Sequence, residues 1–157
     1  MKPVVVAIGS NLADRQAAIR FAVERLSGAL SRLTLSPIIE TEPEGQGLQE
    51  QPLYLNAVVV GESSLSAREM LNALLSIETE FGRTRPSPNA ARTLDLDLIL
   101  SGQEVIDEPG LQVPHPRFRE RFFVLGPLAE VAPDLSDPVT GLKIRELLRA
   151  LLRDESR

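Results

Sequence analysis

The most regular alternation of apolar and polar positions lies between Thr93 and Leu100. Leucines occupy positions 94, 96, 98 and 100, while Thr93, Asp95 and Asp97 occupy positions between them. Successive side chains of a strand point to opposite faces, so this period of two predicts a strand with an apolar and a polar face. The leucines are expected to cover a core, which leaves both aspartates facing solvent or a binding site.

Apolar patterns along the rest of the chain predict short strands and amphipathic helices. Strands are predicted at 3–8, 33–40 and 54–61, and helices at 14–30, 66–81, 118–131 and 144–152. Gly82 is expected to end the second helix, and Pro127 to interrupt the third. Residues 104–106 are expected to return as a short hairpin partner of the central strand. With no repeat or linker visible, one domain covering 1–157 is expected.

Composition excludes several classes of site and partner. The 157 residues include no cysteine and one histidine, which excludes disulfides, thiolate metal sites and zinc sites built from several histidines. The net charge of −5 argues against a nucleic-acid partner or an anionic membrane surface. The chain start resembles no signal peptide, and no apolar run would span a bilayer. We therefore expect a cytoplasmic protein, and a monomer.

The two aspartates of the central strand are candidate metal ligands. Their Cβ atoms would lie about 6–7 Å apart. At an effective dielectric constant of about 20, two carboxylates at that distance repel by about 2–3 kcal/mol. Bound divalent cations would reverse the sign of that term, and Mg²⁺ prefers hard oxygen ligands. The alternative is that Asp95 and Asp97 are simply the hydrated face of an amphipathic strand.

Arginines flank this strand on both sides, namely Arg83, Arg85 and Arg92 before it and Arg117, Arg119 and Arg121 after it. A guanidinium binds phosphate oxygens in pairs. The glycine-rich motifs that bind phosphate through backbone N–H groups are absent from the sequence. Phosphate chemistry here would therefore depend on metal ions and arginines. Arg117 and Arg119 are expected to lie on the solvated surface.

Five short motifs follow one another in a fixed order along residues 4 to about 135. They are 7–12, 54–57, 92–99, 113–117 with Arg121 and Phe123, and 127–130. Together they resemble the signature of the 6-hydroxymethyl-7,8-dihydropterin pyrophosphokinase family of folate biosynthesis. The resemblance implies an α+β, ferredoxin-like antiparallel sheet with helices packed on it. It also implies transfer of pyrophosphate from ATP to the pterin hydroxymethyl group, with release of AMP.

The resemblance also implies roles for individual residues. Asp95 and Asp97 would bind two Mg²⁺ ions that bridge the ATP phosphates, and Arg83 and Arg92 would act on those phosphates as catalytic residues. Other matched positions contact ATP, namely Glu78, Arg85, His115 and Arg121. The pterin pocket would be formed by Thr41, Pro43, Gly45, Tyr54, Asn56 and Phe123. From the residues alone, a tyrosine in a strand such as Tyr54 is more often a packing residue than a ligand contact. His115 could equally be structural.

One departure from the family pattern leaves alternatives open. The family usually has a basic residue, often followed by an aromatic one, shortly before Arg92, whereas residues 88–91 are Pro-Asn-Ala-Ala. One alternative is a non-catalytic protein of the same scaffold that binds nucleotide or pterin without turnover. Another is a kinase of the same fold that acts on a different alcohol. Tyr54 and Asn56 argue against the latter, because they suit a flat heterocycle with an amide-like edge.

Overall fold

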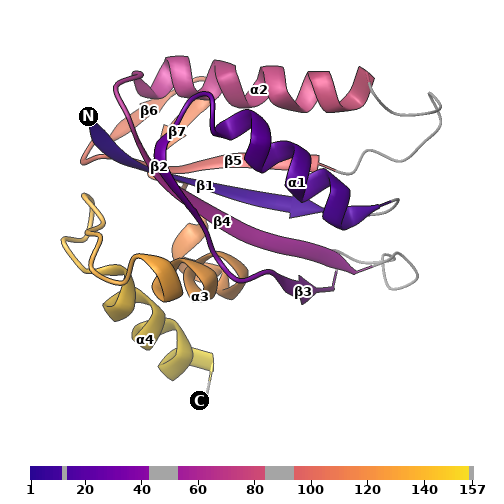
Figure 1. The fold of residues 1–157 in the computed structure, drawn as a ribbon. Coiled ribbons are helices and arrows are strands. Elements are labelled where there is room, and N and C mark those ends of the chain that lie inside the picture. Colours follow the sequence, from indigo (N-terminus) through magenta and orange to yellow (C-terminus); the bar gives the residue numbers. More distant parts are fainter. Residues whose placement is uncertain (12–13, 43–52, 84–93, 156–157) are drawn as a thin grey trace.

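The structure is a computed structural model that describes residues 1–11, 14–42, 53–83 and 94–155, without the side chain of Arg83 (Figure 1). Its strands are β1 (Lys2–Ser10), β2 (Ser31–Leu35), β3 (Ile39–Thr41), β4 (Tyr54–Ser63), β5 (Leu94–Ser101), β6 (Ile106–Glu108) and β7 (Leu111–Val113). Its α-helices are α1 (Arg15–Leu26), α2 (Ala67–Arg83), α3 (Phe122–Val131) and α4 (Ile144–Glu155), and η1 (Phe118–Glu120) is a 3₁₀-helix. Within this described part, no helix is long and apolar enough to cross a membrane.

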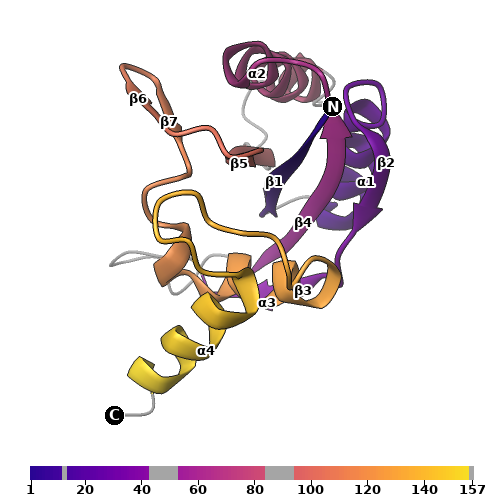
Figure 2. The same cartoon turned by 90° about the vertical axis from the view of Figure 1, so that its left-hand side faces the viewer.

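The main sheet is antiparallel, with strand order β2–β4–β1–β5. Strand β3 pairs with the first residues of β4. Helices α1 and α2 cover one face, and α3, with α4 packed against it, covers part of the other (Figures 1 and 2). The chain order is β-α-β-β-β-α-β, and β2 and β3 lie one after the other along the same edge of β4. This arrangement confirms the predicted α+β, ferredoxin-like fold. Both faces of the sheet therefore need apolar residues.

Strand β1 contributes to both cores because it lies in the middle of the sheet, between β4 and β5. Val4, Val6 and Ile8 pack under α1 and α2 with residues such as Leu74. Val5 points to the opposite face, where it joins the cluster formed with α3 and α4. Both clusters consist of fully or nearly fully buried apolar side chains. Such burial on two faces explains why the first predicted strand is a continuous apolar run rather than an alternating one.

The strand predicted at 33–40 is wrong as a single element, because β2 and β3 are separated by residues 36–38. The Ser36 N–H donates to the Val58 carbonyl at 2.9 Å, and its Oγ accepts from the Val58 N–H at 2.8 Å. The hydroxyl oxygen thus takes the place of a backbone carbonyl as the acceptor for the Val58 N–H. Both backbone groups of Val58 on β4 therefore keep a hydrogen-bond partner across the break.

Two helix boundaries also differ from the prediction. Helix α1 ends at Leu26 rather than at Leu30, because residues 27–29 form a turn that brings Leu30 into the core. Helix α2 starts as its sequence suggests, with Ser66 and Glu69 bonding reciprocally at 2.9 and 3.1 Å. It then runs through Gly82 to Arg83, so the prediction that Gly82 ends it is wrong.

The segment after the central strand also corrects the prediction. Strand β6 pairs with β7, Ile106 opposite Val113, whereas β5 pairs with β1. The helix predicted at 118–131 is divided at Arg121 into η1 and α3. Pro127 lies inside α3 with its ring buried, so it does not interrupt the helix. The break therefore falls six residues earlier than expected, at a position that faces the site described next.

Candidate active site

The β5 aspartates lie on the sheet face that carries α3. Asp95 and Asp97 are exposed, while Leu94, Leu96 and Leu98 between and around them are buried, which confirms the predicted alternation. The side chains of these leucines belong to the core under α1 and α2. The two carboxylates therefore sit on the opposite surface of the same strand, beyond the end of the core that α3 covers.

Strand register places small residues beside these carboxylates. Asp95 lies opposite Gly9 and Asp97 opposite Ala7 on β1. Gly9 in turn lies opposite Asn56 on β4, so one row across three strands reads Asp95, Gly9, Asn56. Partners in an antiparallel pair point to the same face. The row therefore forms a polar floor with a gap at its centre.

A cavity of about 300 Å³ opens over this floor. It is lined by predicted metal and pterin residues, namely Thr41, Tyr54, Asn56, Asp95, Asp97 and Phe123, together with Glu78 and Arg121. The Asn56 Nδ2 donates to the Thr41 Oγ1 at 2.6 Å, which fixes the amide orientation. A Cβ on Gly9 would lie 3.8 Å from both the Asn56 Oδ1 and the Tyr54 ring. The bare glycine keeps this space open.

Arg121 and Phe123 reach the first cavity from the start of α3. Arg121 is the residue that precedes the helix, and its guanidinium carbon lies 5.5 Å from the centre of the Phe123 ring. The first N–H groups of a helix carry a partial positive charge, and the guanidinium adds a full one. This corner of the cavity therefore suits an anionic group, while the Phe123 ring suits a flat apolar one.

Glu78 reaches the same cavity from α2, on the outer edge of β5. Its Oε2 accepts a 2.7 Å hydrogen bond from the Leu96 N–H, between the two aspartates. Since β5 pairs on its other side with β1, this carboxylate occupies an edge that no strand covers among the described residues. The contact ties α2 to the strand that carries the aspartates. Its predicted contact with ATP stays a prediction.

A second cavity of about 680 Å³ lies on the other side of Asp97, which lines both. Its walls come from α2, β5, the β6–β7 hairpin and the segment after β7, with Leu71, Leu98, Gln112 and His115 among its residues. The first cavity is lined mainly by β1, β3, β4 and the start of α3, together with Glu78 of α2 and both β5 aspartates. Two ligands in these cavities would meet at Asp97.

His115 is held in one orientation at the second cavity. Its backbone N–H donates to the Ile99 carbonyl at 3.0 Å, and its Nδ1 accepts from the Arg117 N–H at 3.2 Å. Burial lowers the pKa of His115; Asp97 opposes the shift, and the charges of Arg121 and Arg117 support it. The ring is therefore neutral near pH 7, with its proton on Nε2 as a donor.

The two aspartates suit Mg²⁺ that is only partly coordinated by protein better than a metal ion whose ligands all come from protein. No cluster of three or more histidine, cysteine, aspartate or glutamate side chains placed to hold a metal occurs in the part of the chain that the structure describes. Mg²⁺ commonly binds through one or two carboxylates, with phosphates and waters completing an octahedron. Asp95 and Asp97 provide that number of ligands, so this donor set fits Mg²⁺ bound together with a phosphate chain.

Some predicted site residues lie outside the described residues, namely Pro43, Gly45, Arg85 and Arg92. Arg83 is the last residue of α2, and its side chain is not described. One expectation is wrong: Arg119 does not lie free on the surface but binds the buried Asp137 through two hydrogen bonds. No local sequence signal connects these two residues, which are 18 positions apart.

Comparison with known proteins agrees with the family resemblance of the sequence motifs. Residues 5–133 match the model of the 7,8-dihydro-6-hydroxymethylpterin-pyrophosphokinase family. The chain is 40% identical over 153 residues to the 2-amino-4-hydroxy-6-hydroxymethyldihydropteridine pyrophosphokinase of Pseudomonas aeruginosa, covering 94% of this chain and 90% of that protein. The enzyme of that name from Bacillus subtilis is 41% identical over 138 residues, covering 87% and 81%.

Solved structures agree on the fold. The wild-type HPPK-DHPS protein of Plasmodium falciparum superposes with a TM-score of 0.76 at 14% sequence identity. The match covers 98% of this chain but 45% of that one, so the chain spans less than half of the length of this longer protein. At this low identity the match supports the fold alone.

Proposed function

This chain belongs to the 7,8-dihydro-6-hydroxymethylpterin-pyrophosphokinase family, and we propose how its residues divide the reaction between them. The protein is a pyrophosphokinase that transfers pyrophosphate to hydroxymethyldihydropterin in folate biosynthesis. The proposal adds ATP as the donor, two Mg²⁺ ions and AMP as the second product. We also propose that the protein is a cytoplasmic monomer made of one domain. The observation that carries it is the position of Asp97, which lines both cavities.

The pterin is proposed to occupy the first cavity. Tyr54 and Phe123 offer aromatic faces for a flat heterocycle, and such contacts contribute about 1 kcal/mol each beyond area burial. Because the Asn56 Nδ2 already donates to Thr41, its Oδ1 remains as an acceptor beside the open space above Gly9. That oxygen suits the amino and ring N–H groups of a pterin.

The nucleotide is proposed to occupy the second cavity. Leu71 and Leu98 supply apolar surface for a base. The neutral His115 presents its Nε2–H as a donor toward a phosphate oxygen. The phosphate chain would then extend past Asp97 toward Arg121 and the pterin hydroxymethyl group. Arg83 and Arg92 are proposed to contact the phosphates as well, on the strength of the family resemblance.

In the transfer, the pterin hydroxyl oxygen forms a bond to the β-phosphorus and its proton is released. The bond from that phosphorus to the oxygen bridging the α- and β-phosphates breaks, and AMP leaves with the bridging oxygen. Mg²⁺ bound at Asp95 and Asp97 would supply charge neutralisation along the phosphates. The protein residues position both substrates in line, which is the main requirement of a loose phosphoryl-transfer transition state.

A crystal structure with Mg²⁺, a non-hydrolysable ATP analogue and the pterin tests this assignment. We expect two ions bound by Asp95 and Asp97, the ring between Tyr54 and Phe123, and the base against Leu71. A base found in the first cavity, or ions bound away from both aspartates, would contradict it.

A further inference from the structure

We propose that the Arg119–Asp137 ion pair positions the segment that carries His115 and Arg121, and so sets the affinity for the nucleotide. The inference deepens the proposed function and rests on its assignment of these two residues to ATP. Neither Arg119 nor Asp137 lines either cavity. They are therefore positioning residues rather than catalytic ones.

Both oxygens of the Asp137 carboxylate accept two hydrogen bonds each. The Arg119 Nε donates to its Oδ2 at 2.5 Å and the Arg119 Nη2 to its Oδ1 at 3.0 Å. The Val139 N–H adds a bond to Oδ1 at 3.0 Å, and the Thr140 hydroxyl one to Oδ2 at 2.8 Å. These four donors match the four acceptor sites of a carboxylate. The side chain of Asp137 is completely buried, so each bond is shielded from water.

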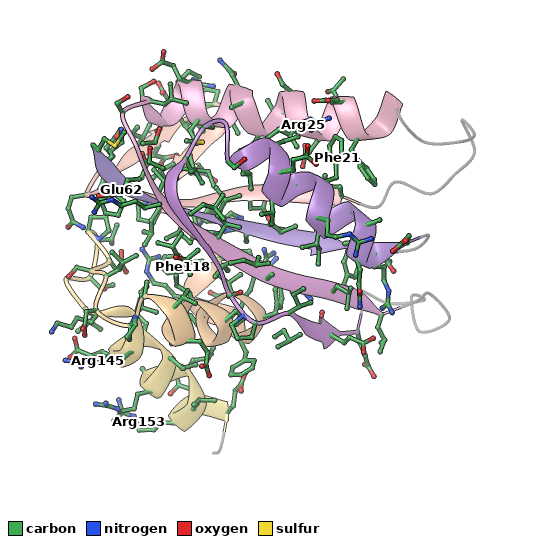
Figure 3. All side chains as sticks on the ribbon, in the orientation of Figure 1. Phe21, Arg25, Glu62, Phe118, Arg145 and Arg153 are labelled. Carbon is green, nitrogen blue, oxygen red and sulfur yellow. The ribbon has the colours of Figure 1, made fainter. Side chains whose placement is uncertain are left out.

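The arginine side of the pair is equally fixed. The Arg119 guanidinium carbon lies 4.8 Å from the centre of the Phe118 ring. Phe118 is itself fully buried between the sheet and the C-terminal helices (Figure 3). A guanidinium held between an aromatic face and a paired carboxylate has few alternative orientations. The centre of η1 is thereby attached to the core on one side and to the 137–141 turn on the other.

This attachment lies between the two site residues, four positions after His115 and two before Arg121. His115 is fixed to the end of β5 through the Ile99 carbonyl, and the Arg121 N–H donates to the Phe118 carbonyl at 3.3 Å. One side chain serves the second cavity and the other serves the first, so the segment between them determines their separation. A shift of η1 would move both donors relative to one phosphate chain.

The 137–141 turn is rigid enough to act as the fixed partner. The Gly141 N–H donates to the Asp137 carbonyl at 2.8 Å, and the Asp137 N–H to the Leu142 carbonyl at 2.8 Å. Gly141 has a φ of +75°, which a residue with a side chain rarely adopts. The turn leads directly into α4, whose Ile144 is buried against α3. The C-terminal helix therefore supports the nucleotide side of the site.

The Asp137→Asn variant tests the inference, with Asp134→Asn as the control. Asp134 is exposed and pairs at 3.3 Å with Arg145 of α4, which Figure 3 labels. We expect Asp137→Asn to raise KM for ATP about tenfold, with the affinity for pterin changed less than about threefold. The control variant should leave both constants unchanged. A lower melting temperature with an unchanged KM for ATP would overturn the proposal, because it would show a structural role alone.

The Arg119→Lys variant keeps the test decisive if Asp137→Asn does not fold. Lysine retains the charge but loses the second hydrogen bond, so a smaller rise in KM for ATP is expected. If its affinity for a non-hydrolysable ATP analogue equals that of the wild type while stability falls, the proposal is wrong. This binding measurement needs no turnover, so it tests the positioning role even if the wild-type protein forms no AMP. Absence of AMP would count against the proposed function instead.

Discussion

Glu78 on α2 accepts a hydrogen bond from the Leu96 N–H of β5, midway between Asp95 and Asp97. The helix thus stabilises the exposed edge of the strand that carries both candidate metal ligands. Glu78 lies five residues before the last residue of α2, and its carboxylate acts outside the helix. That action is the hydrogen bond to the Leu96 N–H, which holds β5 against α2.

Replacement of Glu78 separates its hydrogen bond from its charge. Glu78→Gln keeps an acceptor for the Leu96 N–H, so kcat/KM should stay within about threefold of the wild type. Glu78→Ala removes the acceptor and should cost about 1–3 kcal/mol of unfolding free energy, with at least a tenfold loss of kcat/KM. Urea denaturation and steady-state AMP release measure the two effects. A loss in the Gln variant as large as in the Ala variant would show that the charge itself is required.

The two β5 carboxylates should be needed for activity but not for folding. Asp95→Asn and Asp97→Asn each keep the side-chain size and remove one charge that Mg²⁺ would bind. We expect kcat/KM to fall at least about 100-fold in either variant, with no loss of thermal stability, because repulsion between the carboxylates is relieved. Asp134→Asn on the outer surface serves as the control. Turnover close to the wild-type rate in either β5 variant would refute the metal assignment.

Gly9 should control access of the pterin to the floor of the first cavity. A Cβ there would make ordinary contacts at 3.8 Å with Asn56 and Tyr54, so Gly9→Ala is expected to fold and to bind pterin within about threefold of the wild type. Gly9→Val adds branches in the space proposed for the ring, and should weaken pterin binding at least about tenfold. Calorimetric titration with pterin and, separately, with an ATP analogue checks this. Weakened binding of the analogue alone would place the pterin elsewhere.

Asp137 should contribute to stability in a pH-dependent way. Burial acts to raise its pKa, but the hydrogen bonds from Arg119, the Val139 N–H and Thr140 outweigh burial and lower it. A lowered folded-state pKa means that the contribution is complete above the ordinary value of about 4 and is lost as the pH falls through the folded-state value. Urea denaturation of the wild type and Asp137→Asn should therefore show a stability difference at pH 7 that shrinks below about pH 4. A difference that stays constant across this range would contradict the argument.

The central strand could be predicted from the sequence because its strict alternation of apolar and polar residues fits a strand and not a helix. Alternating leucines and aspartates fit a strand with one buried face, and the structure confirms this from Leu94 to Leu98. Element ends were less predictable, because tertiary contacts decide them. Leu30 fits the apolar stripe of the first helix, yet it reaches the core after a turn. The Ser36 hydroxyl replaces a backbone partner in a way that no local pattern shows.

The motifs were sufficient to name residues that line the first cavity, but not to predict how the cavities are arranged. The family motifs pointed to Tyr54, Asn56 and Phe123, which the fold brings to one cavity. Nothing in those motifs shows that Asp97 separates two cavities, because the second depends on the β6–β7 hairpin meeting α2. Arg119 was misread as a surface residue because its partner Asp137 lies in a turn-rich segment without a pattern of its own.

The most direct test of the central claim is AMP release from ATP by the wild-type protein, measured with and without 6-hydroxymethyl-7,8-dihydropterin and with Mg²⁺ present or chelated. We predict AMP formation only when ATP, the pterin and Mg²⁺ are all present, with one pterin pyrophosphate formed for each AMP. AMP that appears without the pterin, or turnover that survives chelation, would contradict the proposed transfer. Pterin binding without any AMP would show that this scaffold binds its ligands without performing the reaction.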